Sequence, residues 1–170
     1  MTTKLIILAG YPGVGKTFVA TQISKQTDGT VFRSDAIRKE LFPDPTYSKQ
    51  ESEKTYSELF SRAEKSLKSN TVTIIDATFN LKIGRDSATE IAQNQDCEVL
   101  FIKVTCDENT VRKRIENRDG LSDADFSVYQ KVRDSFEPIE KDFETIDNSN
   151  TKKQTKEQIK TILSKNNLSN

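Results

Sequence analysis

The octapeptide Gly10-Tyr-Pro-Gly-Val-Gly-Lys-Thr17 constrains this chain more than any other segment. It matches the pattern G-x-x-x-x-G-K-[ST] at every fixed position, and it contains three of the six glycines in the chain. Glycine allows backbone amides to turn inward and approach an anion closely. An apolar run over 5–9 precedes the octapeptide, and an amphipathic segment over 16–26 follows it. This strand, loop and helix order is the context that a phosphate-binding loop requires.

The positions of this loop have distinct expected roles. We expect the Lys16 ammonium to reach the outer phosphates of ATP and the Thr17 hydroxyl to ligate Mg²⁺. The helix that follows points the positive end of its dipole at the same anion. The residues predicted to bind ATP here are Gly10, Tyr11, Pro12, Gly13, Val14, Gly15, Lys16, Thr17 and Phe18.

Five short runs rich in β-branched and aromatic residues have the length of strands, and longer amphipathic segments separate them. This alternation predicts an α/β fold with a parallel sheet and right-handed crossovers. Ligands bind at the carboxyl ends of such strands, so functional groups should follow the five runs. The expected strands are 5–9, 30–34, 71–75, 98–105 and 143–146.

Helix boundaries follow from capping residues and apolar stripes. Ser48 and Glu51 form a capping-box pair in front of a helix with an apolar stripe from Tyr56 to Leu67. We expect Asn80 to cap a later helix. The expected helices are 16–26, one that begins after Ser48, 81–93, 109–118, one that begins at the Ser122/Asp125 capping pair, and 156–164.

Composition excludes several chemistries. The 26 basic and 26 acidic residues cancel, so the chain has no basic surplus for a long nucleic-acid groove. The absence of histidine excludes a histidine-based triad, metal site or acid/base. Cys97 and Cys106 are too few for a thiolate zinc site and fit a reducing compartment. The N-terminal apolar run is too short for a signal peptide, so we expect a cytoplasmic protein with no membrane partner.

The third expected strand leads directly into Asp76. A carboxylate at the end of a buried strand has the form of a Walker B motif, which lies near the Mg²⁺ of a bound nucleotide. Thr17 and Asp76 are therefore the candidate metal ligands. The segment Asp76-Ala-Thr-Phe79 lacks the glycine of a GTPase switch, and Asn150-Thr-Lys-Lys153 lacks the aspartate of a guanine motif. These absences disfavour a GTPase, and the chain is short for a motor ATPase.

Asp35 and Arg38 lie where the second expected strand meets its helix. Their spacing of three lets both side chains face one cavity. In that position Asp35 could accept the proton of an attacking hydroxyl, and Arg38 could hold an anionic group of the substrate. The alternative is that Ser34 or Asp35 only caps the helix and Arg38 is solvated.

Arginines are concentrated on the expected helix 109–118. Arg114 and Arg118 are four residues apart and share a face, and the turn Asp119-Gly120 follows them. A kinase places a lid in such a helix, turn and helix, here about 112–124, to exclude water and bring arginine to the transferring phosphoryl group. The alternative is an exposed helix face that forms salt bridges with Glu116.

Taken together, these motifs resemble the small P-loop kinases that group polynucleotide 5′-hydroxyl kinases with chloramphenicol phosphotransferase and zeta-toxin-like kinases. The segments that carry the resemblance are Gly10 to Thr17, Arg33-Ser-Asp-Ala-Ile-Arg-Lys-Glu-Leu41, Ile75-Asp-Ala-Thr-Phe-Asn80, and Val111-Arg-Lys-Arg-Ile-Glu-Asn-Arg118 followed by Ser122-Asp-Ala. The resemblance extends over most of the chain, from Leu5 to about Ile146.

The resemblance implies a five-stranded parallel sheet in the order 2-3-1-4-5 and a helical lid. It implies that Lys16, Asp35, Arg118 and Arg114 are catalytic, with Asp35 as the general base. Arg38, Thr78 and Asn80 would bind the acceptor beside Asp35. Arg114 would also contact ATP, and the loop around Asp147 and Ser149 would lie near the adenine.

The main hypothesis is an ATP- and Mg²⁺-dependent phosphotransferase acting on a hydroxyl of a small molecule or of a nucleic-acid 5′ end. Nucleic acid enters only as such a terminal substrate, because the composition offers no basic channel. The alternative is a nucleotide-binding ATPase or regulator that signals through a partner. We expect one kinase domain over residues 1–170, acting as a monomer, with acceptor specificity set by residues 42–69.

Overall fold

Five strands form one parallel sheet in the order β2-β3-β1-β4-β5, as predicted. The computed structural model describes residues 4–69, 71–117 and 123–168. β1 lies at the centre of the sheet, with Leu5 paired to Thr73 and to Val99 of its neighbours. The strands are β1 (Lys4–Ala9), β2 (Thr30–Arg33), β3 (Thr73–Asp76), β4 (Glu98–Thr105) and β5 (Glu144–Asp147).

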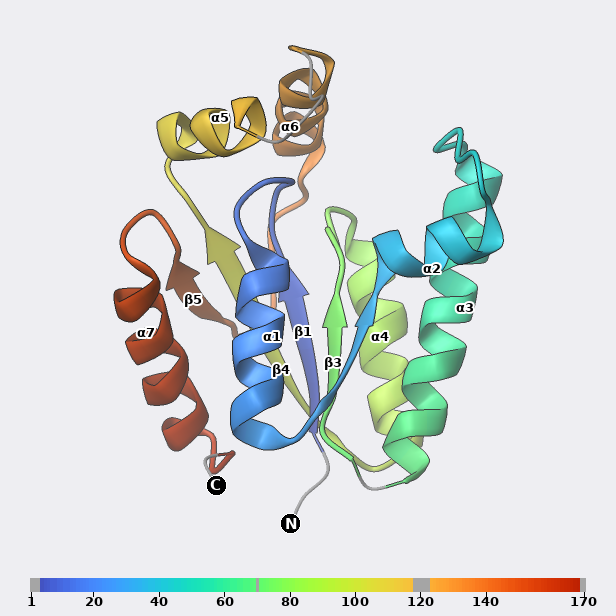
Figure 1. Cartoon of the computed structure of the whole chain (residues 1–170). Coiled ribbons are helices and arrows are strands. Elements are labelled where there is room, and N and C mark those ends of the chain that lie inside the picture. The colour runs from blue at the N-terminus through green and yellow to red at the C-terminus, as the bar shows by residue number, and fades with distance from the viewer. Residues whose placement is uncertain (1–3, 70, 118–122, 169–170) are drawn as a thin grey trace.

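Helices cover both faces of the sheet, and two more lie beyond its carboxyl edge (Figure 1). α1 and α7 pack on one face, and α3 and α4 pack on the other. α5 and α6 stand above the carboxyl ends of the strands. The helices are α1 (Lys16–Thr27), α2 (Ser34–Leu41), α3 (Lys49–Lys68), α4 (Lys82–Asn94), α5 (Glu108–Glu116), α6 (Asp123–Ser135) and α7 (Lys152–Lys165). None of the helices in these described ranges is long and apolar enough to cross a membrane.

The central strand explains the layered arrangement. Successive side chains of a strand point to opposite faces, and every residue of β1 is buried. Ile6 and Leu8 join the core beside α1 and α7, whereas Leu5 and Ile7 join the core beside α3 and α4. A continuous apolar run therefore needs cover on both faces, and the helices provide it.

Some expected helix ends are wrong. Asn80 does not cap α4, because the N-cap position is Leu81 and the carboxylate of Glu137 accepts a hydrogen bond from the Lys82 amide instead. The last helix begins at Lys152, four residues earlier than expected, because Thr151 and Gln154 form a capping box. Ser34 is the first residue of α2 and not the end of a strand. The residues that would cap the helix after the lid turn lie outside the described part or have undescribed side chains.

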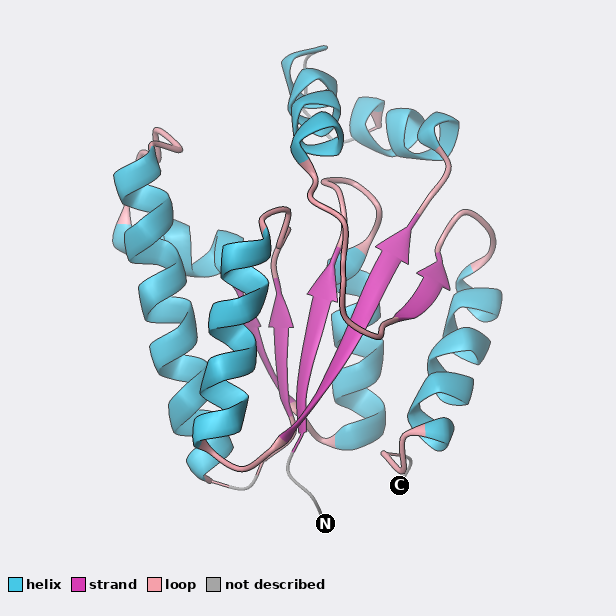
Figure 2. Ribbon diagram, turned by 180° about the vertical axis from the view of Figure 1, so that it is seen from behind, coloured by secondary structure: helices cyan, strands magenta, loops and turns pink. Residues whose placement is uncertain are grey.

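The segment between α6 and β5 returns along the face of the sheet that α3 and α4 cover (Figure 2). Phe136 and Ile139 of this segment pack against the core on that side. The helices at the carboxyl edge are also joined to each other, because Arg133 of α6 forms an ion pair of 3.0 Å with Glu108 of α5. α5 and α6 therefore connect to the body of the molecule through both β4 and this return segment.

Candidate active site

The phosphate-binding loop between β1 and α1 has the backbone that its glycines permit. Gly13 and Gly15 have φ values of 81° and 95°, which L side chains rarely adopt. Gly15 also lacks space for a side chain, because a Cβ atom there would lie 2.1 Å from Nδ2 of Asn148. The loop can therefore adopt this backbone conformation only with glycine at position 15.

Lys16, Thr17 and Asp76 meet beside this loop. The Lys16 ammonium donates to the carbonyl oxygens of Gly10 and Tyr11 at 2.9 and 3.0 Å, so it lies across the loop. Thr17 Oγ1 donates to Oδ2 of Asp76 at 2.8 Å. Asp76 is only 6% exposed, and Nε of Arg33 lies 3.4 Å from the same oxygen. A hydroxyl and a guanidinium thus hold a buried carboxylate in one place.

The donor atoms around Asp76 suit a magnesium ion. Thr17 supplies a hydroxyl oxygen and Asp76 a carboxylate, and Mg²⁺ prefers oxygen ligands at a site that it shares with phosphate and water. Two protein oxygens are few for a metal cage built from protein alone. The residues present therefore fit an ion that arrives with a nucleotide.

Asp35 and Arg38 both lie on α2, but in different environments. Asp35 is exposed in the first turn, and within the described residues its carboxylate forms no hydrogen bond or ion pair. Arg38 is only 8% exposed, so the alternative of a solvated arginine is wrong. The alternative of a Ser34 or Asp35 cap is also wrong, because Arg33 occupies the N-cap position.

The guanidinium of Arg38 is incompletely paired. Its Nη2 donates weakly to Ser52 Oγ at 3.4 Å, while its Nη1 is buried without a hydrogen-bond partner. The Glu51 carboxylate lies 3.9 Å from Nη1, and the ring of Tyr47 lies 4.9 Å from the guanidinium carbon. Buried polar groups are normally satisfied. An anionic group of a ligand would satisfy this one.

Glu51 holds the residues that cover Arg38. Ser48 caps α3 as expected, accepting a hydrogen bond from the Glu51 amide at 3.2 Å. The Glu51 carboxylate reaches past Ser48 and accepts bonds from the amides of Thr46 and Tyr47 at 2.9 and 2.8 Å. The Thr46 amide is the main cause that lowers the pKa of Glu51, with Arg38 a smaller one. The backbone of Tyr47 is therefore held in place, although the residue is 65% exposed.

Thr78 and Asn80 belong to segment 77–81, which follows β3 beside the phosphate-binding loop. The Thr78 carbonyl accepts a hydrogen bond from the Gly10 amide at 3.2 Å, and both side chains are half-buried. Phe79 between them has a φ of 48° and a buried ring. That backbone conformation turns Phe79 into the core and leaves its two neighbours nearer the surface.

Tyr56 is a site residue that sequence reasoning missed. Its position in the apolar stripe of α3 marked it as a core residue, and it does pack on Phe79 with ring centroids 5.8 Å apart. Its hydroxyl nevertheless lies in the field of Arg38, Asp35 and Asp76. Burial is the main cause that raises the pKa of Tyr56. The three predicted groups therefore lie near enough to the half-buried Tyr56 side chain to interact with its hydroxyl electrostatically.

Arg114 of α5 contacts the phosphate-binding loop. Its Nη1 lies 3.3 Å from the Val14 carbonyl oxygen, and its Nη2 donates to the Asn148 carbonyl at 2.7 Å. Asn148 was also missed, because asparagine in a loop is an ordinary turn residue. Its buried Nδ2 donates to the Val14 carbonyl at 2.8 Å, and its Oδ1 accepts from Thr155. The loop is thus held from two distant segments.

The other residues expected on this side have separate places. The Ser149 hydroxyl accepts a bond from the Asp107 amide at 2.8 Å, next to the start of α5. Phe18 lies under Lys152, whose ammonium is 5.9 Å from the ring centroid. Arg118 and most of the expected lid turn lie outside the described residues. α5, which carries the described part of the expected lid, packs on the core through the buried Ile115.

A parallel sheet of this order with a glycine-rich loop between its central strand and first helix defines a P-loop protein of the kinase-like α/β class. The chain belongs to the AAA domain family, which matches residues 5–139. No curated protein matches the sequence.

Solved kinase structures share this fold along nearly their whole length. A sugar kinase from Janibacter sp. HTCC2649 has a TM-score of 0.72 at 17% identity, covering 99% of this chain and 96% of that one. A gluconokinase from Sinorhizobium meliloti 1021 has a TM-score of 0.71 at 16% identity, covering 98% and 97%. The Mycobacterium tuberculosis APS kinase in complex with AMPPNP and APS has a TM-score of 0.73 at 14% identity, covering 96% of each chain.

Proposed function

We propose that this chain is a P-loop kinase that transfers the γ-phosphate of ATP to a hydroxyl acceptor in a Mg²⁺-dependent reaction. The observation that carries the proposal is the 2.8 Å contact between Thr17 Oγ1 and Asp76, which joins the two nucleotide-site motifs at one edge of the sheet. Arg33 is paired with Asp76 in the β2–β3 ladder, so Asp35, in the first turn of α2, lies beside the same edge of the sheet. The fold shared with solved kinases, one of them bound to AMPPNP, supports this reading.

In this proposal the residues of the candidate site have distinct roles in the transfer of the phosphoryl group. The loop amides and Lys16 hold the outer phosphates, and Asp35 accepts the proton of the attacking hydroxyl. Thr17 and Asp76 would hold Mg²⁺, and the bound ion would neutralise charge on the phosphates. Arg114, with Arg118, stabilises the charge that spreads over the transferring phosphoryl group. The loop around Asp147 and Ser149 lies on the adenine side.

The environment of Arg38 indicates the class of acceptor. A buried guanidinium whose Nη1 has no hydrogen-bond partner, only a distant ion pair with Glu51, favours an acceptor that carries an anionic group as well as a hydroxyl. Tyr47 covers this guanidinium, so the ring would move aside or stack on the ligand. Small acidic alcohols and a phosphorylated nucleic-acid end both fit this description. The kinase group of polynucleotide, chloramphenicol and zeta-toxin-like enzymes stays our expectation for the finer class.

A labelled-phosphate transfer assay tests the proposal. Purified protein with γ-labelled ATP is offered gluconate, APS, chloramphenicol and a 5′-hydroxyl oligonucleotide with a 3′-phosphate, each with Mg²⁺ and with EDTA. We expect label to move to at least one anionic acceptor with Mg²⁺ and not with EDTA. Binding of ATP without transfer to any acceptor would favour the regulator, and failure to bind Mg·ATP would exclude both functions.

A further inference from the structure

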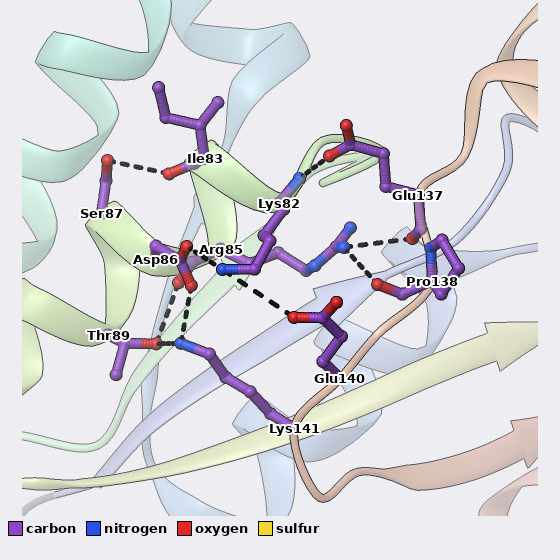
Figure 3. Close-up of polar contacts among 10 residues, drawn as sticks. All are labelled: Lys82, Ile83, Arg85, Asp86, Ser87, Thr89, Glu137, Pro138, Glu140 and Lys141. Carbon is purple, nitrogen blue, oxygen red and sulfur yellow. Dashed lines mark hydrogen bonds and ion pairs between the residues drawn. The ribbon is translucent and has the colours of Figure 1, made fainter.

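Arg85 is a buried charged residue that the proposed reaction does not use. It lies in α4, it is 2% exposed, and it forms no ion pair within the described residues. Its guanidinium donates instead to three backbone carbonyls. Nη1 donates to Phe79 at 2.7 Å, and Nη2 donates to Glu137 at 3.1 Å and to Pro138 at 2.8 Å. Figure 3 shows Arg85 reaching from α4 to the return segment at Glu137 and Pro138.

The two segments that Arg85 joins are far apart in sequence and contact each other directly. The Glu137 amide donates to the Asn80 carbonyl at 2.8 Å. The Glu137 carboxylate accepts a bond from the Lys82 amide at the start of α4. Segment 77–81 and segment 136–141 are thus fastened by Arg85 and by Glu137 together.

Both segments also contact the phosphate-binding loop. The Thr78 carbonyl accepts from the Gly10 amide at 3.2 Å. At the other end, the ring of Phe136 lies 5.3 Å from the ring of Tyr11 and 5.7 Å from the Arg85 guanidinium carbon. A continuous set of contacts therefore runs from the phosphate-binding loop to segment 77–81, through Arg85 to segment 136–141, and from Phe136 back to the loop.

Packing alone does not explain an arginine at this position. Burial lowers the pKa of Arg85, and the acidic neighbours Glu137, Asp86 and Glu140 only oppose that effect. An apolar side chain would fill the space without removing a charge from water. A planar guanidinium can, however, donate to several acceptors in a fixed geometry, which no apolar side chain and no lysine can do. The residue is thus suited to hold backbone segments in register.

We propose that Arg85 is a positioning residue that fixes segment 77–81, with Thr78 and Asn80, against segment 136–141 and the phosphate-binding loop. The inference rests on the proposed function and assigns to Arg85 the alignment of the acceptor with the transferring phosphate. ATP binding does not need this alignment, because Lys16, Asn148 and Arg114 hold the loop by other contacts. Loss of Arg85 should therefore affect the acceptor side of the reaction selectively.

The test compares Arg85→Gln and Arg85→Lys with the control Lys141→Gln. Lys141 belongs to the same cluster in Figure 3, but it contacts the side chains of Asp86 and Thr89 and no carbonyl of segment 77–81. Each variant is assayed for the affinity of a fluorescent ATP analogue, and for kcat and KM with the panel acceptor that gives the highest transfer. Hydrogen exchange is followed in segments 77–81 and 136–141.

We expect Arg85→Gln to lower kcat/KM for the acceptor by about tenfold to a hundredfold, the loss that a misplaced reacting group brings. The affinity for the ATP analogue should stay within about twofold, since the loop contacts persist. Arg85→Lys should fall between wild type and Arg85→Gln, and it decides the test if Arg85→Gln does not fold. Lys141→Gln should match wild type. Equal losses of ATP affinity and acceptor kcat/KM would overturn the inference.

Hydrogen exchange separates this inference from the proposed function. In the Arg85 variants we expect the amides of Lys82 and Glu137 to lose protection together, while Lys141→Gln leaves both unchanged. If the two amides respond independently, the positioning role is wrong even in an active kinase. If they respond together in a chain that transfers no phosphate, the coupling of the segments stands and the proposed function fails.

Discussion

The nucleotide side and the acceptor side of the candidate site differ in how completely their polar groups are paired. The nucleotide side consists of the phosphate-binding loop with Lys16, Thr17 and Asp76. Here Lys16 and Thr17 donate hydrogen bonds to a loop carbonyl and to Asp76. The Val14 carbonyl accepts hydrogen bonds from Arg114 and Asn148. On the acceptor side, the Asp35 carboxylate has no hydrogen bond among the described residues, and Nη1 of Arg38 is buried without one.

This difference in hydrogen bonding indicates which side of the candidate site selects the substrate. A loop whose backbone is fixed by several contacts presents its amides to phosphate without rearrangement. Donors that are preorganised in this way stabilise negative charge most effectively. Under the proposed function, the second substrate would supply the hydrogen bonds that Asp35 and Arg38 lack. The nucleotide side is therefore expected to tolerate few changes, while the acceptor side is expected to determine which hydroxyl compound reacts.

The largest effect is expected from Lys16→Ala. Removal of the ammonium takes away the charge nearest the outer phosphates, so transfer should fall by about 10³-fold or more. The fold should remain, because the hydrogen bonds of this ammonium to the carbonyls of Gly10 and Tyr11 are made within one loop and not in the apolar core. Lys25→Ala, an exposed lysine of the same helix, is the matched control. Transfer rates and thermal melts check this, and unchanged turnover in Lys16→Ala would contradict the assignment.

Asp35→Asn should have the next largest effect and sharpen the distinction between the two sides. If Asp35 is the base, kcat should fall by roughly 10²-fold or more while the Kd of ATP changes little. Asp44→Asn, an exposed acid just beyond α2, serves as control. Steady-state kinetics and nucleotide titration give both values. Losses of equal size in ATP binding and in rate would point to a metal-binding or structural role for Asp35.

Gly15→Ala tests the pairing on the nucleotide side alone. The added Cβ would lie 2.1 Å from Nδ2 of Asn148 and would break its bond to Val14. We expect the Kd of ATP to rise by about tenfold, because a misplaced phosphate donor costs about 1.4 kcal/mol or more. Gly84→Ala is the control, since its Cβ would meet nothing closer than 3.6 Å. Equal affinities for both variants would show that the loop adapts.

The smallest effect is expected from the titration of Glu51. Hydrogen bonds from Thr46 hold the folded pKa of Glu51 below the ordinary glutamate value of 4.5. The ionised carboxylate therefore stabilises the covered position of Tyr47 above pH 4.5, and this contribution is lost as the pH falls through the lower folded value. The chain has no tryptophan, so Tyr47→Trp supplies a fluorescence signal that follows the transition. The transition should disappear when Glu51→Gln is added, and its persistence there would assign it to another group.

Local sequence patterns predicted much of the fold because their causes are local. Glycine at positions 13 and 15 permits a backbone with positive φ, and an uninterrupted apolar run requires a strand that is covered on both faces. The glycines led to the phosphate-binding loop, and the alternation of strands and helices led to the parallel sheet. The order of the strands was implied only by the resemblance to small P-loop kinases. The start of α7 also has a local cause in the sequence, because Thr151 and Gln154 form a capping box.

The amino-acid sequence by itself thus determined the parallel sheet, the phosphate-binding loop and the positions of Lys16, Thr17 and Asp76 along it. Tertiary structure alone decided that Glu137 caps α4 from 55 residues away, and that Asn148 supports the loop from across the sheet. It also decided that Arg38 and Arg85 are buried. The physical reason is that burial and pairing depend on which distant segments meet, whereas backbone preference and apolar periodicity belong to each segment alone.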